Sequence, residues 1–301
     1  MLPQDLISVV SSLTKIKDTQ LLEKDLCLQG LIAELSKIDY FKNNLVFKGG
    51  TCLTKTYFGY YRFSEDLNFT WINQKMFEEK SAKQIRKIIS NELNTIIKII
   101  YKIASKQEFD FKPEKSNKKY VEFGGGNKFV TFKLHYTTIQ EAQSFIKIQI
   151  NFLEELIYPI KEHKISPIGL EFKERLDLEY PEYSEMLTKE SSLFVYDLRE
   201  IASEKIRAIL TRRGFKTRDL IDLYKLSTKG ITIASVKKSA IIKTSMMLKY
   251  EKYSTNIVKK TIHTHLGDEE HLMIITLEKE YYSYIKKAVK ELELISQEIL
   301  K

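Results

Sequence analysis

The stretch VFKGGTCLTKTYFGYYRFSEDLNFTW, residues 46–71, limits the folds open to this chain more than any other part of the sequence. A short apolar run over residues 44–47 leads to Gly49 and Gly50, and helical spacing follows. Residues 66–71 then alternate, with polar side chains on one face and apolar side chains on the other, as in a half-buried strand. The stretch therefore predicts a strand, a glycine turn, a helix and a second strand.

The two glycines admit two interpretations. Glycines let a backbone approach a triphosphate closely, and N–H groups at the start of the next helix then point at the anion, with Thr51 as N-cap or as a phosphate-contacting hydroxyl. Asp66 and Asn68, two residues apart on one strand face, would then hold Mg²⁺ against those phosphates. The other interpretation is a tight turn before an ordinary strand with solvated polar side chains. The glycine pair alone favours the turn.

The rest of the chain predicts an α+β fold. Helical spacing occurs in residues 3–14, 18–37, 76–106, 197–212, 218–228, 233–248 and 270–300. Strand patterns occur in residues 44–47, 66–71, 118–123, 128–137 and 145–152. We therefore expect an α+β domain over residues 1–165, with a mixed sheet flanked by helices, and a mainly helical domain over residues 166–301.

Charge and composition narrow the classes of partner. The formal net charge of +9 and a pI near 9.1 favour nucleotides or nucleic acid, although excess lysine also occurs on ordinary solvated surfaces. Two cysteines are too few for a disulfide framework, which favours a reducing, cytoplasmic location. The sequence has no apolar run of membrane-spanning length and no signal-peptide core, so we expect no membrane partner.

A second segment, residues 197–226, carries charges in unusual places. Lys205 falls within the apolar stripe of a predicted helix, where a lysine extends to solvent, meets an acid, or reaches an anionic ligand. From residue 205 to residue 218 there are six Lys or Arg residues and no acid, which suits a phosphate-rich partner or a solvated helix end. Asp219 and Asp222 follow, in a position where acids also simply stabilise a helix start.

Together, the two segments resemble the AbiEii/AbiGii abortive-infection toxins, which are minimal nucleotidyltransferases of the DNA polymerase β superfamily. The first family motif is matched at Lys48, Gly49, Gly50, Thr51, Leu53, Lys55, Arg62, Ser64, Glu65 and Asp66. KTRDLIDLY, residues 216–224, is similar to the later Arg-Asp-Leu-x-Asp-Leu motif. The chain departs from the family pattern at Asn68, where a second metal-binding Asp is usual.

The resemblance implies a nucleotidyltransferase-like sheet, with a helical C-terminal domain that completes the active-site cleft. It assigns nucleotide binding to Lys48, Gly49, Gly50, Thr51, Lys55, Arg62, Ser64 and Lys205. It assigns catalysis to Asp66 and to Asp219 or Asp222, and metal binding to Asp66, with Asn68 as a weaker ligand and Glu65 as a helper. From the basic run itself we expect RNA binding by Arg212, Arg213, Lys216 and Arg218. The implied cofactor is Mg²⁺ or Mn²⁺, the substrate an NTP, the acceptor RNA such as the tRNA 3′ end, and the partner a cognate antitoxin.

Asn68 keeps another interpretation open. A neutral amide is a poorer Mg²⁺ ligand than a carboxylate, and residues 145–152, where related transferases often place a third acid, offer Gln149 and Asn151. A degenerate transferase would bind an NTP or RNA and yield no transfer product. A pure protein-interaction module would bind neither. His263 and His265 have no further ligand nearby in the sequence, so we interpret them as loop residues.

Overall fold

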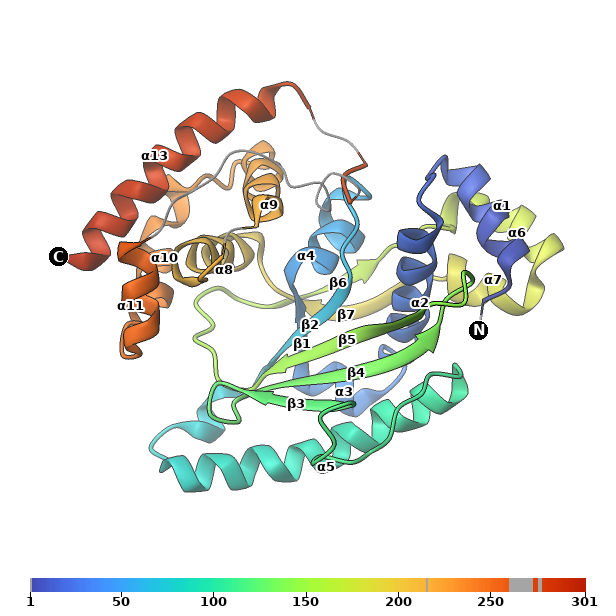
Figure 1. Ribbon diagram of the computed structural model, residues 1–301, viewed down its shortest axis with the longest axis horizontal. Helices are drawn as coiled ribbons and strands as arrows, with labels where there is room; N and C mark the ends of the chain where they lie inside the picture. Colours follow the sequence, from blue (N-terminus) through green and yellow to red (C-terminus); the bar gives the residue numbers. More distant parts are fainter. Residues whose placement is uncertain (1, 215, 260–272, 276–277) are drawn as a thin grey trace. The chain divides into compact units, whose positions relative to one another are not determined.

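The computed structural model describes residues 2–214, 216–259, 273–275 and 278–301. The fold is α+β, as the sequence predicts, and the chain divides into two compact units. The first comprises residues 1–154 and 161–195, and the second comprises residues 155–160 and 196–301. Figure 1 colours the chain by sequence, and the orange and red helices in it belong to the second unit.

The first unit is built on a seven-stranded mixed sheet with the order β3-β4-β5-β2-β1-β7-β6. Its strands are β1 (Leu45–Lys48), β2 (Asp66–Trp71), β3 (Val121–Gly124), β4 (Phe129–Thr137), β5 (Gln143–Asn151), β6 (Lys161–Ile165) and β7 (Ser191–Val195). β2 pairs antiparallel with β1 and parallel with β5. The two strands predicted on either side of the glycine turn therefore lie next to each other near the middle of the sheet.

Helices bury the apolar side chains of this unit. They are α1 (Gln4–Thr14), α2 (Thr19–Leu35), α3 (Asp39–Asn44), α4 (Gly49–Cys52), α5 (Ala82–Lys106), α6 (Lys173–Glu179) and α7 (Pro181–Thr188). Figure 1 shows α5 running along the sheet. α5 begins at a capping box formed by Ser81 and Gln84, and a stripe of isoleucines on one side of it is buried. This amphipathic pattern is the reason that the sequence predicts the helix so clearly.

The second unit is helical, as expected for the C-terminal half. Its helices are α8 (Leu198–Thr211), α9 (Thr217–Thr228), α10 (Lys237–Ser245), α11 (Glu251–Val258) and α13 (Glu280–Leu300). The segment 155–160 joins it because the carboxylate of Glu200 accepts hydrogen bonds from the N–H groups of Ile157 and Tyr158, at 3.0 and 2.8 Å. Lys243, fully buried, forms an ion pair with the same carboxylate at 2.6 Å, so the negative charge of the buried acid is balanced.

The two units are interleaved along the chain. β6 and β7 extend the sheet beyond β1, so the first unit continues past the expected boundary at residue 165 to residue 195. The chain also leaves this unit for residues 155–160 and returns to it. It therefore passes between the units after residues 154, 160 and 195.

Most predicted elements are confirmed to within a few residues. The helix expected from residue 76 begins at Ala82, because Ser81 caps it and residues 74–77 form a separate 3₁₀ turn. The strand β7 (Ser191–Val195) is an element that the sequence patterns did not indicate. The helix expected over residues 270–300 is described from Glu280 onwards. Among the described helices, none has the length and apolar character needed to cross a membrane.

Candidate active site

The turn after β1 leaves little room for side chains at its two glycines. Gly49 has a φ of +82°, in the region that favours glycine, and a Cβ added there would lie 3.3 Å from Asn68 Nδ2. A Cβ on Gly50 would lie 2.2 Å from Arg62 Nη2 and 3.0 Å from Ser64 Oγ. The glycines thus allow the backbone to approach the side chains of Asn68, Arg62 and Ser64 closely.

The helix that follows the turn is short and changes type. α4 (Gly49–Cys52) continues directly as a π-helix over Leu53–Phe58, and such turns are rare and frequently found at functional sites. Thr51 is not the N-cap, because the helix begins at Gly49 and the N-cap position is Lys48. Its hydroxyl donates instead to the main-chain carbonyl of Asp66, at 2.6 Å. The capping role expected as one option for Thr51 is therefore wrong, and the hydroxyl joins the helix to β2.

Asp66 and Asn68 lie on one face of β2, as the alternation predicts, while Leu67 between them is buried. Residues directly opposite on neighbouring strands share a face of the sheet. Asp66 lies opposite Lys147 of β5, and Asn68 lies opposite Lys48 of β1 on one side and Gln149 of β5 on the other. The candidate metal ligands therefore have basic and amide neighbours.

Glu154 is a residue of this face that no sequence pattern indicates. It follows β5, is 8% exposed, and accepts a hydrogen bond from Asn151 Nδ2 at 3.0 Å, while its Oε2 lies 4.0 Å from Lys48 Nζ. Asn151 and Lys48 belong to the strands on either side of β2, so the Glu154 carboxylate reaches across the polar face of β2. A second carboxylate thus approaches the strand on which Asn68 stands in place of an Asp.

Lys55, which the resemblance assigns to the nucleotide, lies in the core. Its side chain is fully buried, and its ammonium pairs with the Asp25 carboxylate of α2 at 2.8 Å and contacts the hydroxyl of Tyr60. Burial lowers the pKa of Lys55, and the negative charge of Asp25 opposes that shift. The buried pair therefore joins the π-helix to α2, and the nucleotide contact expected for Lys55 stays a prediction.

Glu65 and Arg62 also have partners within the first unit. The Glu65 carboxylate pairs with Lys24 of α2 at 2.7 Å, and its expected role as a metal ligand stays a prediction. Arg62 is almost completely buried, and its Nη1 donates to the main-chain carbonyl of Phe63 at 2.7 Å. Its other terminal nitrogen, Nη2, lies against Gly50, so the Arg62 guanidinium is next to the glycine turn.

Within the second unit, the structure brings Lys205, Arg212, Asp219 and Asp222 together. Lys205 Nζ lies 2.8 Å from Asp219 Oδ1 and 2.5 Å from Asp222 Oδ2, and Arg212 Nη1 lies 2.8 Å from Asp219 Oδ2. Burial alone would raise the pKa of Asp219, but the Lys205 ammonium and the Arg212 guanidinium hold it below its ordinary value. Of the alternatives left open for Lys205, the structure thus shows contact with acids.

The other basic residues of the same run differ in exposure. Arg213 and Lys216 are exposed, whereas Arg218 is partly buried and its Nη1 donates to Met273 Sδ at 3.7 Å. Exposed arginine and lysine side chains are available to phosphates, although exposure alone does not identify a partner. The RNA contacts expected for these residues stay a prediction.

The polar face of β2 fits a cation that a nucleotide helps to hold. Asp66 supplies one carboxylate and Asn68 one amide oxygen, and protein-bound Mg²⁺ commonly has one or two carboxylates together with substrate phosphates and water. In the described ranges of the chain, no group of three or more His, Cys, Asp or Glu side chains is arranged to hold a metal. His263 and His265 lie outside the described residues. Asp66 and Asn68 are the candidate ligands for such a cation, and metal binding by them stays a prediction.

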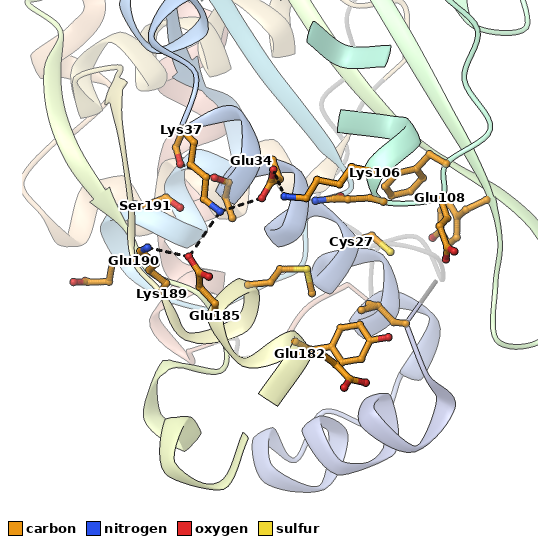
Figure 2. A pocket seen from close by; sticks show the side chains of 18 of the residues that line it. Cys27, Glu34, Lys37, Lys106, Glu108, Glu182, Glu185, Lys189, Glu190 and Ser191 are labelled. Carbon is orange, nitrogen blue, oxygen red and sulfur yellow. Dashed lines mark hydrogen bonds and ion pairs between the residues drawn. The ribbon is translucent and has the colours of Figure 1, made fainter. Parts of the chain in front are cut away.

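A cavity of about 630 Å³ lies elsewhere in the first unit. Residues of α2, α7 and the end of α5 line it, and none of the residues assigned to the active site is among them. Figure 2 shows Lys37 Nζ between Glu34 and Glu185, at 3.0 and 3.8 Å, and Lys106 paired with Glu34 at 2.9 Å. These ion pairs lie within the cavity wall itself.

Comparison with known proteins gives a family and a fold. The family model described as nucleotidyl transferase AbiEii toxin, type IV toxin–antitoxin system, matches residues 33–293. Among solved structures, the nucleotidyltransferase toxin MenT4 from Mycobacterium tuberculosis H37Rv has a TM-score of 0.58 and 17% sequence identity, covering 98% of this chain and 92% of that one. No curated protein sequence matches the chain.

A second solved structure, an antigenic nucleotidyltransferase-like protein from Paracoccidioides brasiliensis, has 13% identity and covers 80% of this chain and 95% of its own. Its TM-score of 0.32 is too low to support a conclusion about the fold. The family match, by contrast, includes the glycine turn and Asp66 in the first unit and the Lys205 cluster in the second. The chain therefore belongs to the AbiEii family of nucleotidyltransferase toxins of type IV toxin–antitoxin systems.

Proposed function

We propose that this nucleotidyltransferase moves a nucleoside monophosphate from an NTP to a hydroxyl of RNA, at the 3′ end of tRNA, in a reaction that needs Mg²⁺ or Mn²⁺. The observation that carries the proposal is the position of Asp66 beside the glycine turn. Thr51, in the helix after the turn, hydrogen-bonds the main chain of Asp66, and the amide of Asn68 lies against Gly49. A backbone free of side chains next to a carboxylate suits a triphosphate held beside its reaction centre.

In the proposed reaction, the acceptor oxygen attacks the α-phosphorus in line, the bond from that phosphorus to the bridging oxygen breaks, and pyrophosphate leaves. The turn at Gly49 and Gly50, with Thr51, Arg62 and Ser64 around it, positions the phosphates. A divalent cation bound by Asp66 and Asn68 would neutralise charge that develops on them. Positioning supplies most of the rate, because the side chains do little covalent chemistry.

We assign the preparation of the acceptor hydroxyl to Asp219 or Asp222. A carboxylate can accept the hydroxyl proton only while it is ionised, and the neighbouring Lys205 and Arg212 lower the pKa of Asp219 against the effect of its burial. Asp222 also pairs with Lys205, at 2.5 Å. The same pairs favour a role for Lys205 in holding these carboxylates, in addition to the phosphate contact that the family resemblance implies.

A transfer assay tests the function. The full chain is incubated with each α-labelled NTP in turn, total RNA or purified tRNA, and Mg²⁺ or Mn²⁺. We expect labelled RNA with the wild type and none with Asp66→Asn, which keeps the shape of the side chain and removes its charge. Asp39→Asn, at an exposed position of α3, is the matched control and should label RNA like the wild type.

If the wild type labels no RNA under any of these conditions, catalysis is excluded. The amides at Asn68, Gln149 and Asn151 would then favour a transferase that binds without reacting, and equilibrium binding of an NTP would identify it.

A cognate antitoxin is part of the proposal. Co-expression with the protein encoded by the neighbouring gene should restore growth that this chain inhibits, and growth that stays inhibited would count against that pairing.

A further inference from the structure

A row of three charged side chains crosses the sheet beside the candidate active site. Asp66 of β2 lies opposite Lys147 of β5, and Lys147 lies opposite Lys133 of β4. The three residues therefore share one face of the sheet. Since neighbouring strands are about 4.8 Å apart, the two lysine positions lie roughly 5 and 10 Å from the strand of Asp66.

An exposed aromatic ring lies next to this row. Phe145 precedes Lys147 by two residues on β5, so it faces the same way, and it is 36% exposed. The Lys147 and Lys133 ammonium groups lie 5.4 and 5.8 Å from the centre of its ring, and the ring of His135 lies 5.4 Å away. Open sheets that carry aromatic rings among basic side chains are a recurrent platform for single-stranded nucleic acid.

The charge on this row is only partly neutralised. Lys133 pairs with Glu122 of β3. For Lys147, in contrast, the described part of the chain places no carboxylate within ion-pair distance, although the residue lies directly opposite Asp66 on the neighbouring strand. An ammonium without a carboxylate partner, partly exposed on a sheet, attracts phosphate.

The row and the glycine turn lie on opposite flanks of β2. β1, which leads into Gly49 and Gly50, pairs with one edge of β2, and β5, which carries Phe145 and Lys147, pairs with the other edge. Asp66 is therefore flanked by a turn suited to a triphosphate and by a basic, aromatic surface. A transferase must hold its two substrates side by side at the reacting group, and this arrangement gives each substrate its own surface next to Asp66.

We propose that Phe145, Lys147 and Lys133, here called the acceptor strip, bind the single-stranded 3′ end of the RNA acceptor. A base stacks on Phe145 and a backbone phosphate contacts Lys147, which brings the terminal hydroxyl toward Asp66. Lys133 leaves its ion pair with Glu122 and contacts the next phosphate instead. The proposal rests on the RNA transfer proposed above, and it adds a subsite that differs from the basic run at Arg212 to Arg218.

Binding of a fluorescent single-stranded oligoribonucleotide to the full chain, followed by anisotropy, tests the strip without requiring turnover. We expect Phe145→Ala and Lys147→Gln each to weaken binding by at least about fivefold, since loss of one stacked base or phosphate contact has an effect of that order. NTP affinity should not change. Phe145→Tyr, which keeps an aromatic ring, should bind nearly as the wild type does. Lys147→Gln should also reduce the salt dependence of binding.

Matched controls lie off the strip. Phe123→Ala removes a similarly exposed ring of β3 from the opposite face, and Lys102→Gln removes an exposed charge of α5. Both should bind the oligonucleotide as the wild type does. Melting temperatures within a few degrees of the wild type would show that the strip variants are folded, and a loss of folding in Phe145→Ala leaves Lys147→Gln as the decisive variant.

The outcomes separate the strip from the transferase activity. If Phe145→Ala and Lys147→Gln bind and label RNA as the wild type does, or if the wild type binds no single-stranded RNA, the acceptor strip is wrong. If the wild type binds the oligonucleotide through these residues and transfers no nucleotide, the strip stands and the proposed reaction does not. Tighter binding of duplex than of single-stranded RNA would also overturn the strip, because a paired base cannot stack on Phe145.

Discussion

Thr51 donates the hydrogen of its hydroxyl to the main-chain carbonyl of Asp66, across 2.6 Å. The bond joins the helix that begins at the glycine turn to the strand that carries the candidate catalytic carboxylate. Thr51 is only 1% exposed, so water does not compete effectively for the bond. The bond thus holds the helix after the turn against the main chain of Asp66 through a contact within the core.

Thr51→Val removes this hydroxyl and keeps the shape of the side chain. We expect the free energy of unfolding to fall by about 1 kcal/mol, since one buried hydrogen bond is lost, and nucleotide transfer to fall about tenfold or more because Asp66 is less well placed. Urea unfolding and the transfer assay measure the two effects. Thr51→Ser is the control and should keep both properties. Wild-type turnover in Thr51→Val would limit the bond to a role in stability.

Asn68→Asp places a second carboxylate against Gly49, at the position where the family usually has one. If the amide is only a weak ligand for Mg²⁺, the substitution should lower the metal concentration needed for half-maximal transfer by about tenfold, because carboxylate is the better ligand. Titration of activity with Mg²⁺ and with Mn²⁺ measures this change. Asn73→Asp adds the same charge at an exposed position outside β2 and should leave the titration unchanged. An unaltered or raised requirement in Asn68→Asp would mean that this side chain does not contact the metal.

Lys55→Met tests the buried pair between the π-helix and α2. Removing the ammonium leaves the Asp25 carboxylate buried without it, which should reduce the free energy of unfolding by about 3–5 kcal/mol. The double variant Asp25→Leu with Lys55→Met should recover much of the loss, because the unpaired charge is gone. Urea unfolding distinguishes the two. A small effect of Lys55→Met alone on the free energy of unfolding would contradict the structural role. If the double variant folds but binds NTP more weakly than the wild type, Lys55 also contributes to nucleotide binding.

The pKa of Asp219 predicts how stability depends on pH. Its pKa in the folded protein lies below the ordinary value of 3.8, so the ionised form stabilises the fold above about pH 4, and this contribution is lost as pH falls through the lowered pKa. The urea midpoint of the wild type should therefore fall more steeply below about pH 4 than that of Asp219→Asn, which starts lower at neutral pH. Parallel pH profiles for the two proteins would contradict the lowered pKa.

The sequence predicted which face of the sheet Asp66, Asn68 and the polar residues of β5 take, because side chains along a strand alternate between its two faces. It did not predict the register. Nothing in the sequence says that Lys147 lies opposite Asp66, since pairing depends on how strands 80 residues apart are aligned. The resemblance located the glycine turn correctly but could not give the tertiary partners of the lysines in its motif. Lys55 and Lys48 belong to the same motif, and only the packing of α2 shows that Lys55 meets Asp25.

Long-range contacts account for the other omissions. Glu154 stands next to Glu155 in a segment without regular spacing, and its burial follows from Asn151 and Lys48. Similarly, the sequence indicated that Lys205 lies in an apolar stripe, but its contact with both Asp219 and Asp222 depends on how α8 packs against α9. Local periodicity predicts which side of an element a residue takes, while tertiary packing decides its partner.

The position of β7 has a consequence for synthesis of the protein. β1 lies between β2 and β7, and β7 is the last strand of the sheet to leave the ribosome. Until residue 195 has been translated, β1 has a partner along only one edge and the other edge stays open to pairing with another chain. The nascent polypeptide therefore contains the whole glycine turn and Asp66 long before their sheet can close, and a truncated product that stops before β7 should aggregate and lack activity.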